Sequence, residues 1–332
     1  MGSLKKQSNS VDPYYIPPDI KSWLSIIETS SEPPSNIVEN LIEEGSISLF
    51  VGRAKEGKSL LAAQLSIDVS EGEPFLGKLK TKKGTVLYID YENRDHKLKI
   101  RGLDLGKDRK LDNVYFVTYE KIFERDLGLD GKNLDHLAEV IEQVSPKLLV
   151  IDPLRLATGG DLSESWKVIS MLNKLSQLLQ GKNSNTGILL VHHLVKTSND
   201  FTVKLRHDPR SWIEKTFGSQ ALIAHVETII GLERDGDGLY TLATVPRSSE
   251  PITWSLEKAI QSERFVLCED AEQIKTWPPA LQKGYAELPQ DFSWTEGAAI
   301  VGNSTLDRII RKAKPLGLIQ QDPKTKRYNK VG

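Results

Sequence analysis

The feature that most restricts the fold of this chain is a glycine-containing stretch between an apolar run and a helical pattern. Residues 46–51, SISLFV, are typical of a buried strand, and GRAKEGKS follows at once over residues 52–59. This stretch fits G-x-x-x-x-G-K-[ST], in which the glycines let backbone N–H groups surround a phosphate. A helix predicted from Lys58 to about Glu71 would add its positive N-terminal end. Strand, loop and helix together predict a nucleoside triphosphate site.

Each residue type in this loop has an expected task. Lys58 would reach the β- and γ-phosphates, and the Ser59 hydroxyl would bind Mg²⁺. ATP and Mg²⁺ are therefore the expected cofactors. A turn that matches the pattern by chance is the alternative, and both flanks argue against it. The predicted nucleotide-binding residues are Gly52, Arg53, Ala54, Lys55, Glu56, Gly57, Lys58, Ser59 and Leu60.

Apolar runs alternate with helical patterns through the first two thirds of the chain. Strands that are apolar throughout and separated by helices are typical of a parallel sheet covered on both faces. After residue 226, four further runs are separated by turns only, and DGDG at 235–238 is a hairpin signal. The predicted fold class is α/β, a mostly parallel sheet with an antiparallel extension. The predicted parallel strands are 46–51, 84–90, 114–118, 147–152 and 186–193.

Acidic residues and histidines end three of these strands, where ligands bind in α/β sheets. Asp152 follows KLLVI and is the expected Mg²⁺ ligand, with a turn or helix-cap aspartate as the alternative. Asp90 and Glu92 share a face two residues apart, and Glu92 lies further toward the crevice, so it is the expected catalytic carboxylate. His193, or second His192, would contact the γ-phosphate; a buried structural histidine is the alternative.

Two basic segments are candidates for DNA contact. The loop at 196–219 has a net charge of +2 and includes Phe201 and Trp212, a combination suited to single strands. A second loop, 155–165, is expected at the same edge of the sheet. From residue 303 onward there are eight basic and two acidic residues, in a chain of net charge -1. The predicted DNA-binding residues are Lys196, Lys204, Arg206, Arg210, Arg308, Arg311, Lys312 and Lys326.

The C-terminal segment has the pattern of a winged helix-turn-helix. Three helical stretches near 279–286, 293–302 and 304–317, the last capped by Ser304, precede two short strands joined by DPKTK. The third helix would enter a major groove. A module for protein contact alone is the alternative. The predicted domains are an N-terminal arm with a short docking helix (1–37), an ATPase core (38–272) and this unit (278–332).

Composition excludes several classes of protein. The single cysteine, Cys268, leaves no disulfide framework and fits a reducing cytoplasm, where we expect the protein. No apolar run approaches the ~20 residues of a membrane span, so no membrane partner is expected. The near-neutral net charge confines any nucleic-acid contact to local patches.

Five segments of the chain, taken in order, resemble RecA-fold ATPases, and within that fold the plasmid RepA-like hexameric helicases. The segments are GRAKEGKS, VLYIDYENRDHKLKIR, KLLVIDPLRL, GILLVHH and FGSQAL. The resemblance covers roughly residues 38–257 and implies a RecA-like core with ATP between the subunits of a ring. It matches Lys58 and Ser59 to the phosphate-loop pair, Glu92 to the catalytic glutamate, Asp152 to the Mg²⁺ aspartate and His193 to the phosphate sensor.

The resemblance also implies an arginine donated by the neighbouring subunit. Arg247, in TVPRSSEP, matches the position used by DnaB-type rings, and Arg234 is the second candidate. The RepA-like position lies near Glu227 instead, and Val245 replaces the lysine that often precedes the DnaB-type arginine. These departures leave the trans site less well matched than the phosphate loop.

The expected activity is ATP hydrolysis by a DNA motor, a replicative helicase-like or helicase-loading ring of a plasmid, phage or integrated element. Expected partners are single-stranded and duplex DNA, further copies in a hexamer, and a replication initiator or primase. The alternative is a DNA-binding initiator or regulator that uses ATP as an assembly switch without unwinding. A strand-exchange recombinase is a weaker third reading, because the N-terminal arm shows no polymerisation segment.

Overall fold

The computed structural model divides the chain into two units, Met1–Pro34 and Ser35–Gly332, which are considered separately. In the first unit, the predicted apolar patch forms helix α1 (Trp23–Thr29), and its Trp23, Leu24 and Ile27 side chains are exposed. Docking of this helix onto the core stays a prediction. The described residues are 20–29, 34–107, 109, 111–129, 133–159, 162, 164–194, 203–216, 220–236, 238–259, 262–268, 277–314, 318–322 and 325–330.

Within the described residues, the second unit is built on a nine-stranded mixed sheet with the order β11-β10-β9-β8-β3-β7-β6-β4-β5. The strands from β8 to β5 are parallel to their neighbours, and β9, β10 and β11 continue the sheet antiparallel. This confirms the predicted mixed α/β sheet. The strands are β3 (Ile47–Gly52), β4 (Val86–Asp90), β5 (Val114–Val117), β6 (Leu148–Asp152), β7 (Gly187–His193), β8 (Thr228–Gly236), β9 (Leu239–Pro246), β10 (Ile252–Lys258) and β11 (Phe265–Leu267).

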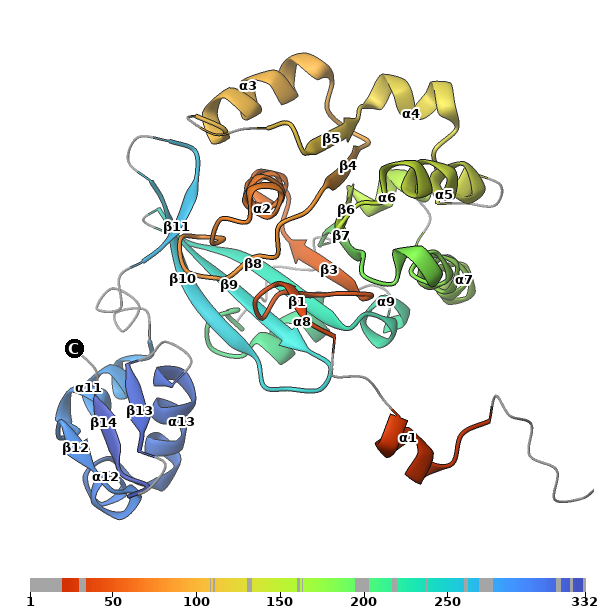
Figure 1. Ribbon diagram of the computed structural model, residues 1–332. Coiled ribbons are helices and arrows are strands. Elements are labelled where there is room, and N and C mark those ends of the chain that lie inside the picture. Colours follow the sequence, from red (N-terminus) through yellow and green to blue (C-terminus); the bar gives the residue numbers. More distant parts are fainter. Residues whose placement is uncertain are drawn as a thin grey trace, which may run out of the picture. The chain divides into compact units, whose positions relative to one another are not determined.

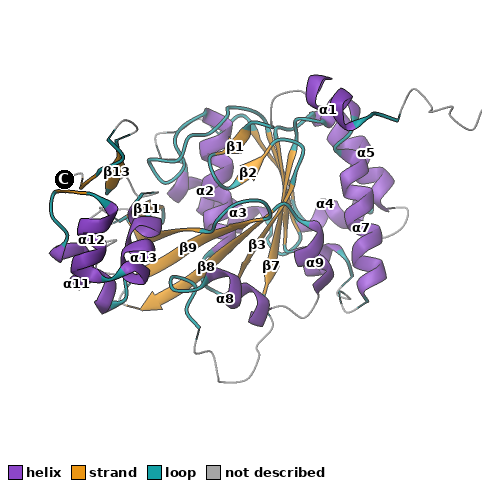
Figure 2. Cartoon of the chain, turned by 90° about the horizontal axis from the view of Figure 1, so that it is seen from below, coloured by secondary structure: helices purple, strands orange, loops and turns teal. Residues whose placement is uncertain are grey.

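Helices cover both faces of the sheet, which is why its central strands are apolar throughout. Figures 1 and 2 show α2 on one face and α5, α7 and α9 on the other. Each face has its own apolar core. The helices of this part are α2 (Lys58–Glu71), α3 (Asp95–Leu105), α4 (Tyr119–Arg125), α5 (Asn133–Val144), α6 (Leu154–Ala157), α7 (Ser165–Leu178), α8 (Pro209–Thr216) and α9 (Gln220–His225), with a 3-10 turn η1 (Gly181–Asn183).

Several short elements were not predicted. Strands β1 (Asn36–Val38) and β2 (Ile42–Glu43) form a small hairpin. Helices α4 and α6 follow β5 and β6 directly, and each is too short to show a helical repeat in sequence. Helix α8 interrupts the segment that was predicted as one long loop over 196–219.

The last strand of the sheet is tied to the helix that follows the phosphate loop. The Gln64 amide on α2 donates to the Phe265 carbonyl at 2.8 Å and accepts from the Phe265 N–H at 2.7 Å. Arg264 pairs with Asp68, which is fully buried on the same helix. Burial raises the pKa of the Asp68 carboxyl to about 6, although Arg264 and Arg109 act against this. Residues 200 positions apart in the chain therefore hold α2 against the sheet.

The C-terminal segment forms three helices beside a three-stranded antiparallel sheet with the order β12-β14-β13. Its core includes Leu281, Phe292, Leu306, Ile309 and Tyr328. The strand β12 was not predicted, because two residues carry no period-2 pattern. The elements are α11 (Pro279–Glu287), β12 (Asp291–Phe292), α12 (Trp294–Val301), α13 (Asn303–Ala313), β13 (Ile319–Gln321) and β14 (Tyr328–Lys330).

The predicted cap of α13 was wrong. Ser304 lies inside that helix, whose N-cap is Gly302 with a φ of 80° and no side-chain cap. The capping box in this unit belongs instead to α12, where Ser293 and Glu296 bond each other's backbone N–H groups. Among the described helices of the chain, none is long and apolar enough to cross a membrane.

Candidate nucleotide site

The phosphate loop connects the central strand β3 to α2 and wraps tightly. Lys55 and Gly57 have positive φ angles of 66° and 97°, which turn successive N–H groups toward the inside of the loop. A Cβ at Gly52 would lie 2.6 Å from the Leu232 carbonyl oxygen, so only glycine fits at the start of the loop. Gly57 then caps α2, whose N-terminus points at the loop. The predicted strand, loop and helix are all present.

Lys58 lies inside this loop and is only 2% exposed. Its Nζ donates to the Arg53 carbonyl at 2.6 Å, and the Arg53 N–H donates to Glu56 at 2.9 Å. Burial lowers the pKa of the Lys58 ammonium to about 8, although Glu56, Asp152 and Glu92 raise it. A desolvated ammonium with few fixed partners is suited to binding a phosphate oxygen.

Asp152 ends β6 at the same edge of the sheet and is buried. It accepts hydrogen bonds from the Tyr88 hydroxyl on β4 and from the Ser59 hydroxyl of the phosphate loop. Burial raises the pKa of the Asp152 carboxyl, and these two hydrogen bonds lower it. The two predicted metal ligands are therefore in contact.

This pair fits Mg²⁺. A hydroxyl and a carboxylate are oxygen ligands, and Mg²⁺ usually takes few protein ligands and the rest from phosphates and water. Within the described part of the chain, no group of three His, Cys, Asp or Glu residues could hold a metal by itself. When bound, Mg²⁺ would neutralise charge on the phosphates. The residues that would hold it are Ser59 and Asp152.

Asp90 and Glu92 have different surroundings, although Asp90 ends strand β4 and Glu92 comes just two residues later. Asp90 is fully buried and accepts hydrogen bonds from the backbone of Glu92 and Asn93. Glu92 is exposed and interacts electrostatically with Lys58 and His193. Of these two carboxylates, Glu92 acts on the lysine of the phosphate loop, and Asp90 is engaged with the backbone.

The two histidines end β7 next to the start of the loop, with His193 in register with Gly52. Burial lowers the pKa of His192 to about 4, helped by His193, Lys58 and Arg155. Burial and Lys58 also lower the pKa of His193, whereas Glu92 raises it. Neutral imidazoles at this position can donate to or accept from a phosphate without fixed charge. The role of His193 as a phosphate sensor stays a prediction.

Three residues near the site were missed. Tyr88 holds Asp152, and its position in an apolar strand gave no sign of this role. Arg155, on α6, acts electrostatically on both histidines. Arg101, on α3, places Nη1 4.0 Å from the Asp90 carboxylate. Of these three, only Arg155 had a signal in the sequence. It is a basic residue shortly after Asp152, where the chain leaves the sheet at the end that binds ligands.

A family model described as an AAA domain matches residues 16–199, more than half of the chain. The chain belongs to this AAA domain family. The match includes the phosphate loop and the strands that carry Glu92, Asp152 and His193. A search of curated proteins found no match. Membership of the AAA domain family makes the protein an ATPase of the P-loop class, in agreement with the site described above.

The two candidate arginines lie near opposite ends of the neighbouring strands β8 and β9. Arg234, at the end of β8, stacks over the Tyr240 ring at 5.9 Å, and its backbone bonds Glu56 in the phosphate loop. Arg247 follows β9 and is exposed, and its N–H donates to the Glu227 carbonyl at 2.9 Å. Because β9 is antiparallel to β8, Arg247 lies at the edge away from its own phosphate loop.

The predicted DNA-binding residues of the core are mostly paired with acidic groups. Lys204 lies 3.7 Å from Glu233, Arg206 3.8 Å from Asp235, and Arg210 3.8 Å from Glu250. Lys196 and Phe201 lie outside the described residues. The prediction that Trp212 stacks on bases was wrong, because this side chain is fully buried in the core. Its apolar area is better accommodated between α8 and the sheet than in solvent.

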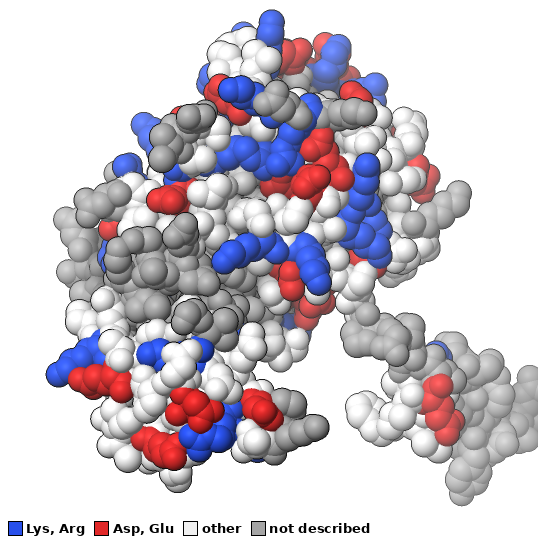
Figure 3. Space-filling model, turned by 60° about the vertical axis from the view of Figure 1, so that its left-hand side comes forward, with Lys and Arg blue, Asp and Glu red and all other residues white. Residues whose placement is uncertain are grey.

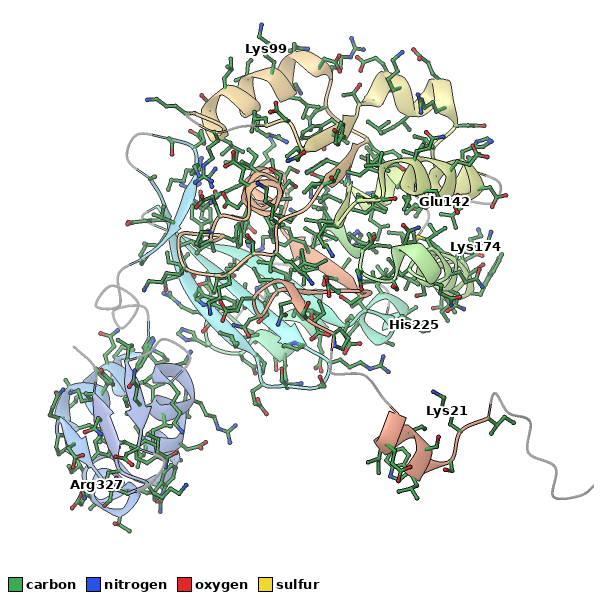
Figure 4. All side chains as sticks on the ribbon, in the orientation of Figure 1. Lys21, Lys99, Glu142, Lys174, His225 and Arg327 are labelled. Carbon is green, nitrogen blue, oxygen red and sulfur yellow. The ribbon has the colours of Figure 1, made fainter. Side chains whose placement is uncertain are left out.

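The C-terminal basic residues differ in exposure. Arg308 and Lys326 are exposed, and Arg311 pairs with Asp307 one turn away. Lys312 is half-buried and donates to the Arg206 carbonyl at 3.0 Å. Burial lowers its pKa to about 8. Basic and acidic side chains are intermingled on the face of this unit seen in Figure 3, and Arg327, labelled in Figure 4, pairs with Asp291 and Glu296.

Proposed function

We propose that this chain is an ATP-dependent DNA motor, a replicative helicase-like or helicase-loading ring ATPase of a plasmid, phage or integrated element. The observation that carries the proposal is Glu92, an exposed carboxylate just after β4 that acts electrostatically on Lys58 and His193. Binding ATP requires only the loop and a metal site. A carboxylate at the γ-phosphate position is what hydrolysis requires, and a motor depends on hydrolysis.

The proposed chemistry assigns one task to each side chain. Lys58 binds the β- and γ-phosphate oxygens and offsets their charge as it shifts toward the leaving group. Glu92 orients a water molecule in line with the γ-phosphate and accepts its proton. His193 contacts the γ-phosphate and changes partner when that phosphate leaves. Tyr88 keeps the Asp152 carboxylate directed at Ser59.

The position of Arg247 supports action in trans. Leu242 of β9 is level with Gly52 through Leu232, and Arg247 lies five residues further along, roughly 17 Å at ~3.3 Å per residue, so Arg247 does not reach its own phosphate loop. A neighbouring copy in a ring, expected to be a hexamer, would have to receive it. Arg234 lies beside the loop of its own chain and suits a role in cis.

A mixing experiment tests this arrangement. Arg247→Ala and Lys58→Ala should each be inactive alone, because one lacks the trans arginine and the other cannot bind ATP. When they are mixed, an intact site forms wherever a Lys58→Ala copy gives Arg247 to an Arg247→Ala copy. We expect the ATPase rate of the mixture to exceed either variant by about tenfold or more, since such a finger is worth roughly 10³–10⁵ in GTPases.

A matched mixture of Arg234→Ala with Lys58→Ala separates the two arginines. If Arg234 acts in cis, this mixture should stay as slow as Arg234→Ala alone. Recovery with Arg234→Ala but not with Arg247→Ala would assign the trans role to Arg234. No recovery in either mixture, with rings present by mass photometry, would contradict a trans arginine.

We also propose that the C-terminal segment is a separate winged-helix domain over 278–332, and its three helices and three-stranded antiparallel sheet support this. Two exposed basic residues there, Arg308 and Lys326, form no ion pair among the described residues and suit duplex DNA. This domain would bring the ring to duplex DNA or to an initiator or primase. The core would span 38–272, after an arm over 1–37.

One observation favours the alternative of an ATP-dependent assembly switch. Lys204, Arg206 and Arg210 are paired with acids of the core, so a single strand would have to displace these pairs. A switch needs no such displacement. It predicts slow ATP turnover that DNA does not change, together with site-specific duplex binding.

Steady-state ATPase assays with and without DNA decide between the two. For a motor, we expect single-stranded DNA to raise kcat by about tenfold or more. Lys204→Ala and Arg206→Ala should lose this stimulation while keeping the basal rate, and Lys283→Ala, on the exposed face of α11, is the matched control. An unchanged rate with single strands would reject the motor and support the switch.

A further inference from the structure

The Asp90 carboxylate holds the backbone that carries the proposed catalytic residue. Its Oδ1 accepts the N–H groups of Glu92 at 3.0 Å and of Asn93 at 2.8 Å. The Asn93 side-chain amide donates to both Asp90 oxygens, at 3.1 and 3.0 Å. A fully buried carboxylate is therefore engaged by two of the residues that follow it, Glu92 and Asn93.

The residue between Asp90 and Glu92 is anchored as well. The Tyr91 N–H donates to the Asp152 carbonyl at 2.8 Å, and its hydroxyl donates to the Leu127 carbonyl at 2.8 Å. Glu92 is thus an exposed side chain on a backbone that is fixed on both sides. Only its own torsions stay free, which reduces the entropy lost when it orients a water molecule.

This arrangement brings two carboxylates close together. Asp90 and Asp152 are directly paired in the register of β4 and β6. The Arg101 guanidinium, from α3, lies 4.0 Å from Asp90 and is partly buried. Its charge acts on Asp152 in the direction opposite to that of Asp90. Arg101 therefore offsets part of the repulsion between the two neighbouring carboxyl groups.

We propose that Asp90 is a positioning residue for ATP hydrolysis, which acts by clasping the Glu92–Asn93 backbone so that the Glu92 carboxylate faces the γ-phosphate. The inference rests on the proposed role of Glu92. It gives the two acids of YIDYEN different tasks. Glu92 orients water and accepts its proton, and Asp90 fixes the direction of the Glu92 side chain. Asp90 itself touches neither phosphate nor water in this assignment.

Three variants of the full chain test the clasp. Asp90→Ala removes every acceptor, and we expect kcat to fall by ~10- to 100-fold, because a displacement of about 1 Å can cost 10²-fold. Asp90→Asn keeps one oxygen for the two N–H groups and should lose less. Asn93→Ala removes only the side-chain amide and should lose least. KM and the affinity for a fluorescent ATP analogue should stay within about threefold for all three.

A double-mutant cycle distinguishes positioning from a general structural role. Each clasp variant is combined with Glu92→Gln, and single-turnover hydrolysis of radiolabelled ATP is measured. A residue that acts through Glu92 should cost little further rate once Glu92 is replaced. Asp104→Ala, an exposed acid on α3, is the control in both backgrounds and should leave the rates unchanged.

The outcomes are distinct. Additive losses in the Glu92→Gln background would overturn the proposal, because Asp90 would then act independently. Wild-type kcat in Asp90→Ala, with Glu92→Gln inactive, would overturn the clasp and leave the proposed function intact. Full activity in Glu92→Gln would overturn both. If Asp90→Ala does not fold, Asp90→Asn and Asn93→Ala are used instead. Each is combined with Glu92→Gln, and additive losses of rate would again overturn the proposal.

Discussion

Replacing Lys58 with alanine is expected to weaken ATP binding by about 10²-fold or more and to abolish turnover. Hydrogen bonds to charged groups are worth roughly 1.5–3 kcal/mol each, and every 1.4 kcal/mol is tenfold in affinity. Lys58 is also the cation that faces Glu56, Asp152 and Glu92. Without it, the repulsion between these carboxylates and the phosphates would be less well offset.

The same substitution should leave the fold intact. Burial lowers the pKa of Lys58, which means that folding disfavours its charged form at neutral pH. Removing the ammonium therefore removes a cost, and we expect the free energy of unfolding to fall by no more than about 1 kcal/mol. Titration with a fluorescent ATP analogue and thermal unfolding measure the two effects.

Lys97→Ala, on the exposed face of α3, is the control and should bind nucleotide normally. If Lys58→Ala bound the analogue as tightly as the unchanged protein, the loop would not be the nucleotide site. A large loss of stability would show instead that the Lys58 bond to Arg53 holds the loop together.

Replacing Glu92 with glutamine is expected to lower kcat by about 10²–10⁴-fold while leaving nucleotide affinity nearly unchanged. General base catalysis contributes a factor of this size, and glutamine keeps the shape of the side chain but cannot accept a proton in the same way. Rate and affinity separate because Glu92 acts on water and not on the bound nucleotide. Steady-state kinetics and analogue titration give the two quantities.

The matched control is Glu120→Gln, an exposed acid on α4 that pairs with Arg94 at 3.6 Å. It should retain full activity. If Glu92→Gln kept a normal kcat, the role of base would pass to another group. A parallel loss of affinity and rate would point to a ground-state contact with the nucleotide.

Much of the site could be predicted because it lies on long, apolar elements. Lys58 and Ser59 follow a buried strand, and Asp152 and His193 end two others, so the sheet brings together what the sequence separates. The sequence already favoured Glu92 over Asp90, because Glu92 lies further toward the crevice. Their spacing puts both on one face, and only the backbone hydrogen bonds show that Asp90 is already engaged.

The errors have physical causes as well. Trp212 was assigned to DNA because aromatic and basic residues alternate around it, but a large apolar ring gains more by burial in the core. Ser304 is a residue type that often caps helices. Helix α13, however, begins at Asn303, and Gly302 is its N-cap. Lys204 and Arg206 were assigned to DNA from the local excess of basic residues. Their acidic partners lie on β8, about 30 residues further along the chain, so a local charge count does not include them.

The two hydrogen bonds between Gln64 and Phe265 have a consequence for folding during translation. The phosphate loop leaves the ribosome early, but β8, which flanks β3, and β11, which holds α2, are synthesised some 170–200 residues later. At roughly 5–20 residues per second, this delay is on the order of ten to forty seconds. During that time β3 lacks its neighbour β8 and α2 lacks its hydrogen bonds to Phe265, so the strand and helix on either side of the phosphate loop are without part of their support.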